Sequence, residues 1–554
     1  MGIPSFYNKL IQTIAGITSF ILAKNPDVLA FDANCAVYHI HKKLQTDGVF
    51  YDCSKHDEYE NKLIQETVKY FESIISEVKP NKAVYIALDG VVPFAKILQQ
   101  RRRRFKSIQT KKDENAIKKS SKPFFDTNCI TPGTSFMSKL NKALTTMSEK
   151  YSSPKVFVSS SDEYGEGEQK VMEFIRCNNK IYKSFLVYGL DADLIILSML
   201  HMMKQTVEIN LVREECEFNS DGSSTKLVYM NLQSLVHSLY TKYGNKDQSV
   251  EIFIKDFIGM MNILGNDFVP HAYSLKIREN GIETVLNTLQ DVLKTAKYET
   301  LIKNDYSYNV DILTQLFEHL SKYEEHLILK KIHAKSVRKA GFFCSSSDPV
   351  EKELATYNDS PLEWKADSIF VTSYSTEGKL VHNWNDLYNT HILYDNKEKA
   401  IDLYLKSLSF TMDYYVGNPI NTDFYYPFQY SPLFNDIYTF IKTKKITLLN
   451  VDSAETKTVI HPIVQLLCVL PEESFYLLPD KYKCVIEKYP MYWPKSFTYF
   501  SYGKYYMYEC EPIIPILHTT TGLKMFENLN KTCEEIDTFE SVLPIPSFKK
   551  LKHL

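Results

Sequence analysis

The sequence predicts an α/β protein with a mostly parallel central sheet flanked by helices, and a mixed α+β region packed against it. Short apolar runs alternate with helix-like stretches over the first 275 or so residues, which is typical of parallel βα units. Acidic residues follow several of these runs directly. The predicted buried strands are Val28–Phe31, Ala83–Leu88, Val156–Val158 and Phe185–Leu190, and the clearest helices are Asn61–Val78 and Ala192–Lys204.

Composition narrows the class of protein. The chain has 554 residues, enough for roughly three to four domain-sized units. Its net charge of −2 provides no overall basic field, so any nucleic-acid affinity must come from local patches. The ten cysteines are scattered without a C-x-x-C pair, which favours reduced thiols in an intracellular protein over a zinc ribbon. Ile11–Leu22 is too short and polar for a membrane span or a signal peptide, so we expect a soluble protein without membrane contact.

The amino-acid composition changes twice along the chain, after about residue 275 and after about residue 395. Residues 276–395 are rich in Lys, Glu and Tyr with helical periodicity, and 345–349 is a predicted loop. From about residue 396 the composition becomes aromatic, and residues 531–554 form a proline-containing tail. Asn219–Lys226 is predicted as a hairpin turn or exposed loop between two strands.

Seven carboxylates in the first half of the chain are the main functional signal. Carboxylates at the carboxyl ends of several parallel strands converge on one crevice. Such a cluster repels itself unless cations occupy it, and hard divalent ions such as Mg²⁺ require oxygen-rich sites of this kind. Two ions about 3.5–4 Å apart can activate water and stabilise the leaving oxygen of a phosphodiester. The seven are Asp32, Asp89, Glu166, Glu168, Asp191, Asp193 and Asp267.

Each acidic group also has a simpler interpretation. Asp191 or Asp193 could cap the helix that follows, as could one of the two glutamates, and Asp89 before Gly90 could mark a turn. For a single group the capping interpretation is the stronger one. The glycines beside Glu166 are not needed for a cap, however, and they permit tight turns. All the simple interpretations would have to hold independently, which favours a shared site.

A basic segment, KILQQRRRRFK at Lys96–Lys106, follows Asp89 by seven residues. If Phe94–Lys106 is helical, four side chains suited to phosphate lie on one face. A solvated basic face or a localisation signal are the alternatives, and for an isolated run they would be preferred. Proximity to the acidic groups favours a phosphate clamp made by Lys96, Gln100, Arg103 and Arg104.

Aromatic and histidine residues give a weaker signal. Tyr38 and His39 follow Asp32 by about two helical turns. A ring there could stack on a base, worth about 1–3 kcal/mol in single-strand binding, although core packing is an equal alternative for Tyr38. His201 and His271 lack metal-ligand spacing and are interpreted as structural.

Taken together in this order, the motifs resemble the XRN family of 5′→3′ exoribonucleases. The match begins at Met1-Gly2-Ile3-Pro4-Ser5-Phe6 and extends to about residue 520. It includes LDGVVPFAKILQQRRRRF, ITPGTSFM, SSSDEYGEGEQKVMEFIR, VYGLDADLIIL, LVREECEF and ILGNDFVPH, and more weakly LYLKSLSFTMDYYVGNP, FYYPFQYSP, QLLCVLPEESFYLLP and YECEPIIPIL.

The resemblance implies a catalytic nuclease domain of flap-nuclease (PIN-like) type over 1–275, a variable helical connection over 276–395, and a second region over 396–530 that walls the active site. The seven carboxylates match the metal-binding set, expected to hold two Mg²⁺ ions, with Mn²⁺ as the expected substitute. Lys96, Gln100, Arg103 and Arg104 match the 5′-monophosphate pocket, with Lys96 also placed to touch the scissile phosphate. The implied activity is processive digestion of single-stranded RNA from a 5′-monophosphate, releasing mononucleotides.

The resemblance also implies the setting of the protein. We expect a monomer whose substrate is supplied by a decapping activity. The expected location is the cytoplasm, or a host cytoplasm or virion if the gene is viral, with the nucleus left open. The chain resembles a compact core form, without the long C-terminal extension of large family members.

The sequence departs from the family at two places. Tyr38 stands where the family has a stacking histidine, and Thr422 and Phe424 stand where it has paired tryptophans. Two other functions stay open: a structure-specific flap-type DNA nuclease, and a catalytically dead RNA-binding scaffold. The intact acidic set argues against the scaffold, and the ITPGTSFM string and second region argue against the flap nuclease.

Overall fold

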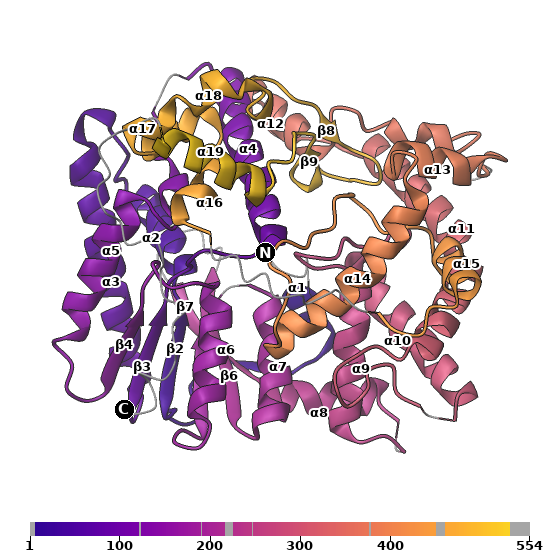
Figure 1. The fold of residues 1–554 in the computed structure, drawn as a ribbon, viewed down its shortest axis with the longest axis horizontal. Helices are drawn as coiled ribbons and strands as arrows, with labels where there is room; N and C mark the ends of the chain where they lie inside the picture. The colour runs from indigo at the N-terminus through magenta and orange to yellow at the C-terminus, as the bar shows by residue number, and fades with distance from the viewer. Residues whose placement is uncertain are drawn as a thin grey trace.

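The computed structural model describes residues 6–120, 123–189, 191–216, 225–245, 247–297, 299–375, 378–449 and 460–531. Within them, seven strands form one sheet at the lower left of Figure 1, in the order β1-β7-β6-β5-β2-β3-β4. The strands are β1 (Thr18–Ser19), β2 (Val28–Asp32), β3 (Ala83–Ala87), β4 (Lys155–Ser159), β5 (Ser184–Tyr188), β6 (Glu208–Cys216) and β7 (Thr225–Asn231).

The centre of the sheet is parallel, as predicted. Strand β2 pairs in parallel with both β3 and β5, and these pair in parallel with β4 and β6. The pairings of β7 with β6 and with β1, at one edge, are antiparallel. The four predicted strands are all present, although β5 ends at Tyr188 rather than at residue 190. The register sets Asp32 opposite Ala87, so β2 and β3 end at the same edge.

Alternate residues of β2 pack on opposite faces of the sheet, because strand side chains alternate. Leu29 and Phe31 pack against α2 (Asn34–Thr46), α3 (His56–Val78) and α5 (Ser135–Ser148). Val28 and Ala30 join the core of the other face. That face is covered by α1 (Phe6–Thr13), α6 (Gly167–Asn178), α7 (Asp193–Gln205), α8 (Leu232–Tyr243) and α9 (Val250–Ile263). The predicted α/β class is therefore confirmed.

The later part of the chain is mainly helical. It contains α10 (Gly281–Thr295), α11 (Val310–Ala340), α12 (Pro349–Asp359), α13 (Trp384–Ile392), α14 (Lys397–Val416), α15 (Phe434–Lys444), α16 (Pro462–Val469), α17 (Asp480–Lys483), α18 (Val485–Lys488) and α19 (Thr519–Lys531), with a small antiparallel pair, β8 (Tyr499–Phe500) and β9 (Glu511–Pro512). One apolar cluster contains buried residues from Phe6 to Phe500. The boundaries proposed after 275 and 395 stay predictions. The 219–224 loop and the tail after 531 lie outside the described residues.

Helix α4 (Phe94–Ile117) leaves the sheet and rises toward the top of Figure 1, where α16 lies against it. It continues well beyond the predicted end at Lys106, because QTKKDENAI contains no Gly or Pro to stop a helix. Its apolar face packs into a third core cluster with α16, α17 and α19. The helix thus joins the sheet to the last part of the chain.

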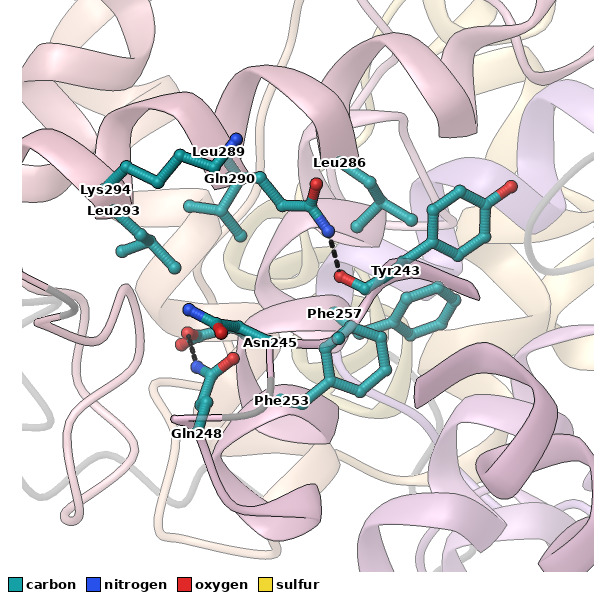
Figure 2. A pocket seen from close by; sticks show the side chains of 12 residues that line it. Tyr243, Asn245, Gln248, Phe253, Phe257, Leu286, Leu289, Gln290, Leu293 and Lys294 are labelled. Carbon is teal, nitrogen blue, oxygen red and sulfur yellow. Dashed lines mark hydrogen bonds between the residues drawn. The ribbon is translucent and has the colours of Figure 1, made fainter. Parts of the chain in front are cut away.

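A separate cavity of about 230 Å³ lies between the α8–α9 connection, α9 and α10. Figure 2 shows Phe253 and Phe257 on one side of this cavity and Leu286 and Leu289 on the other, and Gln248 Nε2 donates to Asp256 Oδ2 at 2.8 Å at one end. None of the seven carboxylates lines this cavity. Among the described residues, no helix has both the length and the apolarity needed to cross a membrane.

Candidate metal centre and phosphate-binding helix

The fold brings all seven predicted carboxylates together at one edge of the sheet. Asp32 ends β2, Asp89 follows β3, and Glu166 and Glu168 begin α6 after β4. Asp191 and Asp193 follow β5, whereas Asp267 comes from the loop after α9. These carboxylates lie close enough for the charge of one to shift the pKa of another. Burial, followed by the charges of Asp89, Asp191, Asp193 and Glu166, raises the pKa of Asp32 well above its ordinary value.

Two glycines let the chain around Glu166 approach β2 and β3. Gly165 has φ +108°, a conformation that side chains disfavour. A Cβ on Gly167 would lie 2.4 Å from Asp32 Oδ1. The Gly167 N–H instead donates to Asp89 Oδ1 at 2.7 Å. Glycine is therefore needed so that backbone and carboxylates can share this space.

No capping hydrogen bond is found from the cap residues of α6 and α7. Glu166 occupies the cap position of α6, but its side chain makes no capping hydrogen bond. The cap of α7 is Ala192, which makes none either. Asp89 accepts from Gly167 and from Asn34 Nδ2 at 2.9 Å, so it joins separate elements rather than only closing a local turn.

Lys96 is the buried cation of this site. Its Nζ lies 2.6 Å from Glu166 Oε2 and 2.7 Å from Asp267 Oδ2. Burial alone would lower the pKa of Lys96, but Asp267, Glu166 and their acidic neighbours raise it well above its ordinary value. Burial would likewise raise the pKa of Asp267, but Lys96 brings it below the ordinary value. Lys96 is therefore charged and fixed by two carboxylates.

Three carboxylates remain without a hydrogen bond or ion pair to any described residue: Asp32, Glu168 and Asp193. Asp193 Oδ1 is buried and has no hydrogen-bond partner in the part of the chain that the structure describes. Burial and the charges of Asp267 and Asp191 raise the pKa of Asp193 to about 7. Burial and the charge of Asp193 also raise the pKa of Glu168 well above its ordinary value. Unpaired, mutually repelling oxygens fit a hard divalent cation.

A second group of possible ligands lies at the start of α3. Ligand atoms of His56, Asp57 and Glu60 lie within 4.8 Å of one another. Glu60 already forms an ion pair with Lys139, and His56 Nδ1 bonds to Tyr51. This group, which the sequence did not single out, is thus compensated by local partners, unlike the trio above.

The predicted phosphate-binding face lies on α4 beside the carboxylates. Lys96, Gln100 and Arg104 are each less than 10% exposed. Gln100 Oε1 and Arg104 Nη1 are buried without a partner among the described residues, which is costly unless a ligand completes them. Arg103 is partly exposed on the same side.

Of the two candidate stacking residues, Tyr38 faces this helix. Its side chain is 40% exposed. Loss of hydration raises the pKa of its hydroxyl, and the charges of Arg103 and Arg104 oppose that rise. His39 instead stacks on Tyr70, with ring centroids 5.2 Å apart.

The four-arginine run divides into two pairs. Arg101 is 1% exposed, and its guanidinium donates to the carbonyls of Cys468, Pro515 and Tyr492. Arg102 donates to the carbonyl of Pro427 at 3.0 Å. Sequence reasoning missed this anchoring role. The i, i+4 spacing of Ile97, Arg101 and Phe105 was the available signal, because it places Arg101 on the apolar face.

The second region reaches the site through α14. The Tyr414 hydroxyl donates to Glu166 Oε1 at 2.9 Å. Of the two departures from the family pattern, Thr422 accepts from the Phe94 N–H at the start of α4, and Phe424 packs on Phe410. His201 is buried against the carbonyl of Tyr415, and His271 contacts the carbonyl of Ala272. Neither histidine is placed with the carboxylates.

Comparison with known families now gives the class of the protein. The model of the XRN 5′-3′ exonuclease N-terminus matches residues 1–215. The model of the Xrn1 helical domain matches residues 247–368 and 386–540. These matches cover most of the chain, which therefore belongs to the XRN family.

Individual relatives agree with this membership. The chain is 26% identical to human 5′-3′ exoribonuclease 1 over 97% of its own length and 34% of that protein. It is 27% identical to 5′-3′ exoribonuclease 2 of Saccharomyces cerevisiae over 70% of the chain and 44% of the relative. It is 31% identical to 5′-3′ exoribonuclease 1 of the same yeast over 53% of the chain and 21% of the relative. The chain thus spans less than half the length of these relatives.

Among solved structures, the bacteriophage T5 D15 flap endonuclease in complex with DNA and metal ions matches with a TM-score of 0.27 and 12% identity, covering 59% of this chain and 95% of that one. A score this low establishes neither a shared fold nor a shared activity. The flap-nuclease-like description of residues 1–275 therefore stays a prediction.

Proposed function

We propose that the protein is a metal-dependent 5′→3′ exoribonuclease that degrades single-stranded RNA from a 5′-monophosphate and releases mononucleotides. The proposal rests on the position of the carboxylate cluster next to the phosphate-binding face of α4. Among the residues that the structure describes, carboxylates without partners lie beside a helix face on which buried Gln100 and Arg104 also present polar atoms without partners. Membership of the XRN family supports the same activity.

The residues suited to hold the metal are Asp32, Glu168 and Asp193, with the remaining carboxylates acting through water or by holding other side chains. Two Mg²⁺ ions, or Mn²⁺ in their place, would supply water activation and charge stabilisation for hydrolysis of a phosphodiester. Lys96 lies between Glu166 and Asp267 and so presents a fixed positive charge next to this trio. We assign to Lys96 the binding of the scissile phosphate.

The direction of digestion follows from α4. Gln100, Arg103 and Arg104 lie one to two helical turns beyond Lys96, roughly 6–12 Å along the axis. A terminal phosphate held by Arg103 and Arg104 would set the distance from the 5′ end to the cut, because one rigid helix carries both sites. Tyr38 beside these arginines would stack on the first base.

The test is hydrolysis of one unstructured RNA with a 5′-monophosphate, 5′-hydroxyl or 5′-triphosphate, with Mg²⁺, with Mn²⁺ and with chelator. We expect fast release of mononucleotides from the monophosphorylated RNA only, and only with metal. Equal rates on all three ends would contradict the phosphate site. A DNA flap cut faster than the RNA would favour the alternative nuclease function, and metal-supplemented protein without hydrolysis would favour an inactive RNA-binding scaffold.

A further inference from the structure

Two adjacent tyrosines at the end of α14 face the acidic cluster from the second part of the chain. Tyr414 and Tyr415 are 7% and 1% exposed. In the sequence, both tyrosines lie more than 200 residues after Asp193. Their position raises the question of what two buried hydroxyl groups do beside unpaired carboxylates.

Tyr414 fixes one of the carboxylates. Its hydroxyl donates to Glu166 Oε1 at 2.9 Å, while Lys96 occupies Oε2 at 2.6 Å. Both oxygens of Glu166 are therefore held, which fixes its orientation. The ring of Tyr414 packs edge-on against Phe268, with centroids 4.8 Å apart. Phe268 directly follows Asp267, so Tyr414 supports both carboxylates that hold Lys96.

Tyr415 presents a donor that the protein does not use. Its hydroxyl is buried and has no hydrogen-bond partner among the described residues. After burial, the strongest influences on its pKa are the charges of Asp193 and Glu168, which raise it. Asp193 Oδ1 is also buried, with no partner among the described residues. A buried donor and a buried acceptor that are both unsatisfied are costly, unless a further group completes them.

The end of α14 is held in place independently of these hydroxyls. The carbonyl of Tyr415 contacts His201 Nε2 at 3.1 Å, and Arg176 packs directly against Gly417. A Cβ on Gly417 would lie 2.6 Å from the Arg176 guanidinium. The backbone is thus fixed by α6 and α7, so removing either hydroxyl should leave the helix where it is.

We propose that Tyr414 and Tyr415 are positioning residues of the metal centre: Tyr414 orients Glu166 and Lys96, and Tyr415 donates to a water of the cation held by Glu168 and Asp193. This inference rests on the proposed function, because it requires a cation at the carboxylates. It assigns to the second region a part in metal binding as well as in enclosing the site. Groups that orient metal ligands typically contribute 10–100-fold to affinity or activity.

The test compares Tyr414→Phe and Tyr415→Phe with a matched control, Tyr404→Phe. Tyr404 is a fully buried tyrosine of the same helix whose hydroxyl also has no partner among the described residues. After burial, Tyr308 and Glu324 raise its pKa, and none of the seven carboxylates does. Mn²⁺ affinity is measured by calorimetry without RNA, and kcat and KM are measured with monophosphorylated RNA. Thermal unfolding with chelator checks the fold.

We expect Mn²⁺ affinity to fall on the order of 10-fold in Tyr414→Phe and by several-fold in Tyr415→Phe, with kcat reduced, KM retained and Tyr404→Phe unchanged. Wild-type binding and kcat in both variants would overturn the inference and leave the proposed function standing. Equal losses in all three variants would also overturn it, because they would indicate a packing effect. Wild-type protein that neither binds Mn²⁺ nor hydrolyses RNA would overturn both.

Discussion

Two sets of buried carboxylates in this protein have opposite surroundings. Asp367, between α12 and α13, is completely buried and fully paired: one oxygen accepts from Tyr273 at 2.6 Å and the Gly503 N–H at 2.7 Å, and the other lies 2.5 Å from Lys335. At the sheet edge, Asp32, Glu168 and Asp193 are also buried, but they have no such partners among the described residues. A paired buried charge joins segments of the fold, whereas a group of unpaired ones indicates a site that a ligand completes.

The largest expected effect is on the unpaired set. Asp193→Asn should reduce RNA hydrolysis about 10³–10⁴-fold, since loss of a metal ligand removes several kcal/mol of transition-state stabilisation. The free energy of unfolding in chelator should stay the same or rise, because one repelling charge is gone. Single-turnover kinetics and urea unfolding measure the two. Lost stability together with retained activity would contradict the contrast.

The paired set should behave in the reverse way. Lys335→Met leaves Asp367 buried without its cation, so the free energy of unfolding should fall by about 3–5 kcal/mol. Urea denaturation measures the change, and adding Asp367→Asn should recover part of it. Lys397→Met, which removes an exposed ion pair with Asp436, is the control and should cost about 1 kcal/mol or less. Equal effects of the two lysine changes would contradict the assignment.

The basic helix should affect discrimination between RNA ends. Arg104→Gln should reduce the preference for a 5′-monophosphate over a 5′-hydroxyl about 10–100-fold, because charge-assisted bonds contribute about 1.5–3 kcal/mol. Competition between the two RNAs gives the ratio of kcat/KM. Lys118→Gln, at the exposed end of α4, should leave the ratio unchanged. An unchanged ratio in Arg104→Gln would remove the arginine from the phosphate site.

The smallest effect is a link between pH and metal. The folded-state pKa values of Asp32, Glu168 and Asp193 are raised above their unfolded values. Without metal, the stability that protonation provides is present at low pH and is lost as pH rises toward about 7. Mg²⁺ should therefore stabilise the protein more at pH 8 than at pH 6, by about 1 kcal/mol. Thermal unfolding with and without Mg²⁺ at the two pH values measures this stabilisation. Equal stabilisation at both values would contradict the linkage.

Most of the sheet and its acidic edge follow from local sequence. Apolar runs such as VLAFD and AVYIA are buried on both faces, so their pattern is strong. Carboxylates at strand ends follow from the same logic. Asp267 fits this rule less well, because it reaches the site from the loop after helix α9 and not from the end of a strand. The roles of the seven carboxylates and of α4 stay predictions until the experiments above are done.

Contacts between distant segments could not be read from sequence. Tyr414 meets Glu166 across 248 positions, and no local pattern encodes such a pairing. The arginine run is a similar case. Helical spacing selected Arg103 and Arg104, together with Lys96 and Gln100, as the phosphate-binding face. It gave no role to Arg101 and Arg102, which the tertiary fold uses as anchors.

The anchoring of Arg101 has a consequence for synthesis of the protein. Its carbonyl partners lie 367, 391 and 414 positions further along the chain. At about 5–20 residues per second, they leave the ribosome roughly 20–80 s after α4. During that interval α4 lacks the partners of its buried face, and Tyr414 has not yet reached Glu166. A nascent chain therefore carries every strand-end carboxylate before α4 is anchored, and the carboxylate site is assembled only after the segments that bind Arg101 have been made.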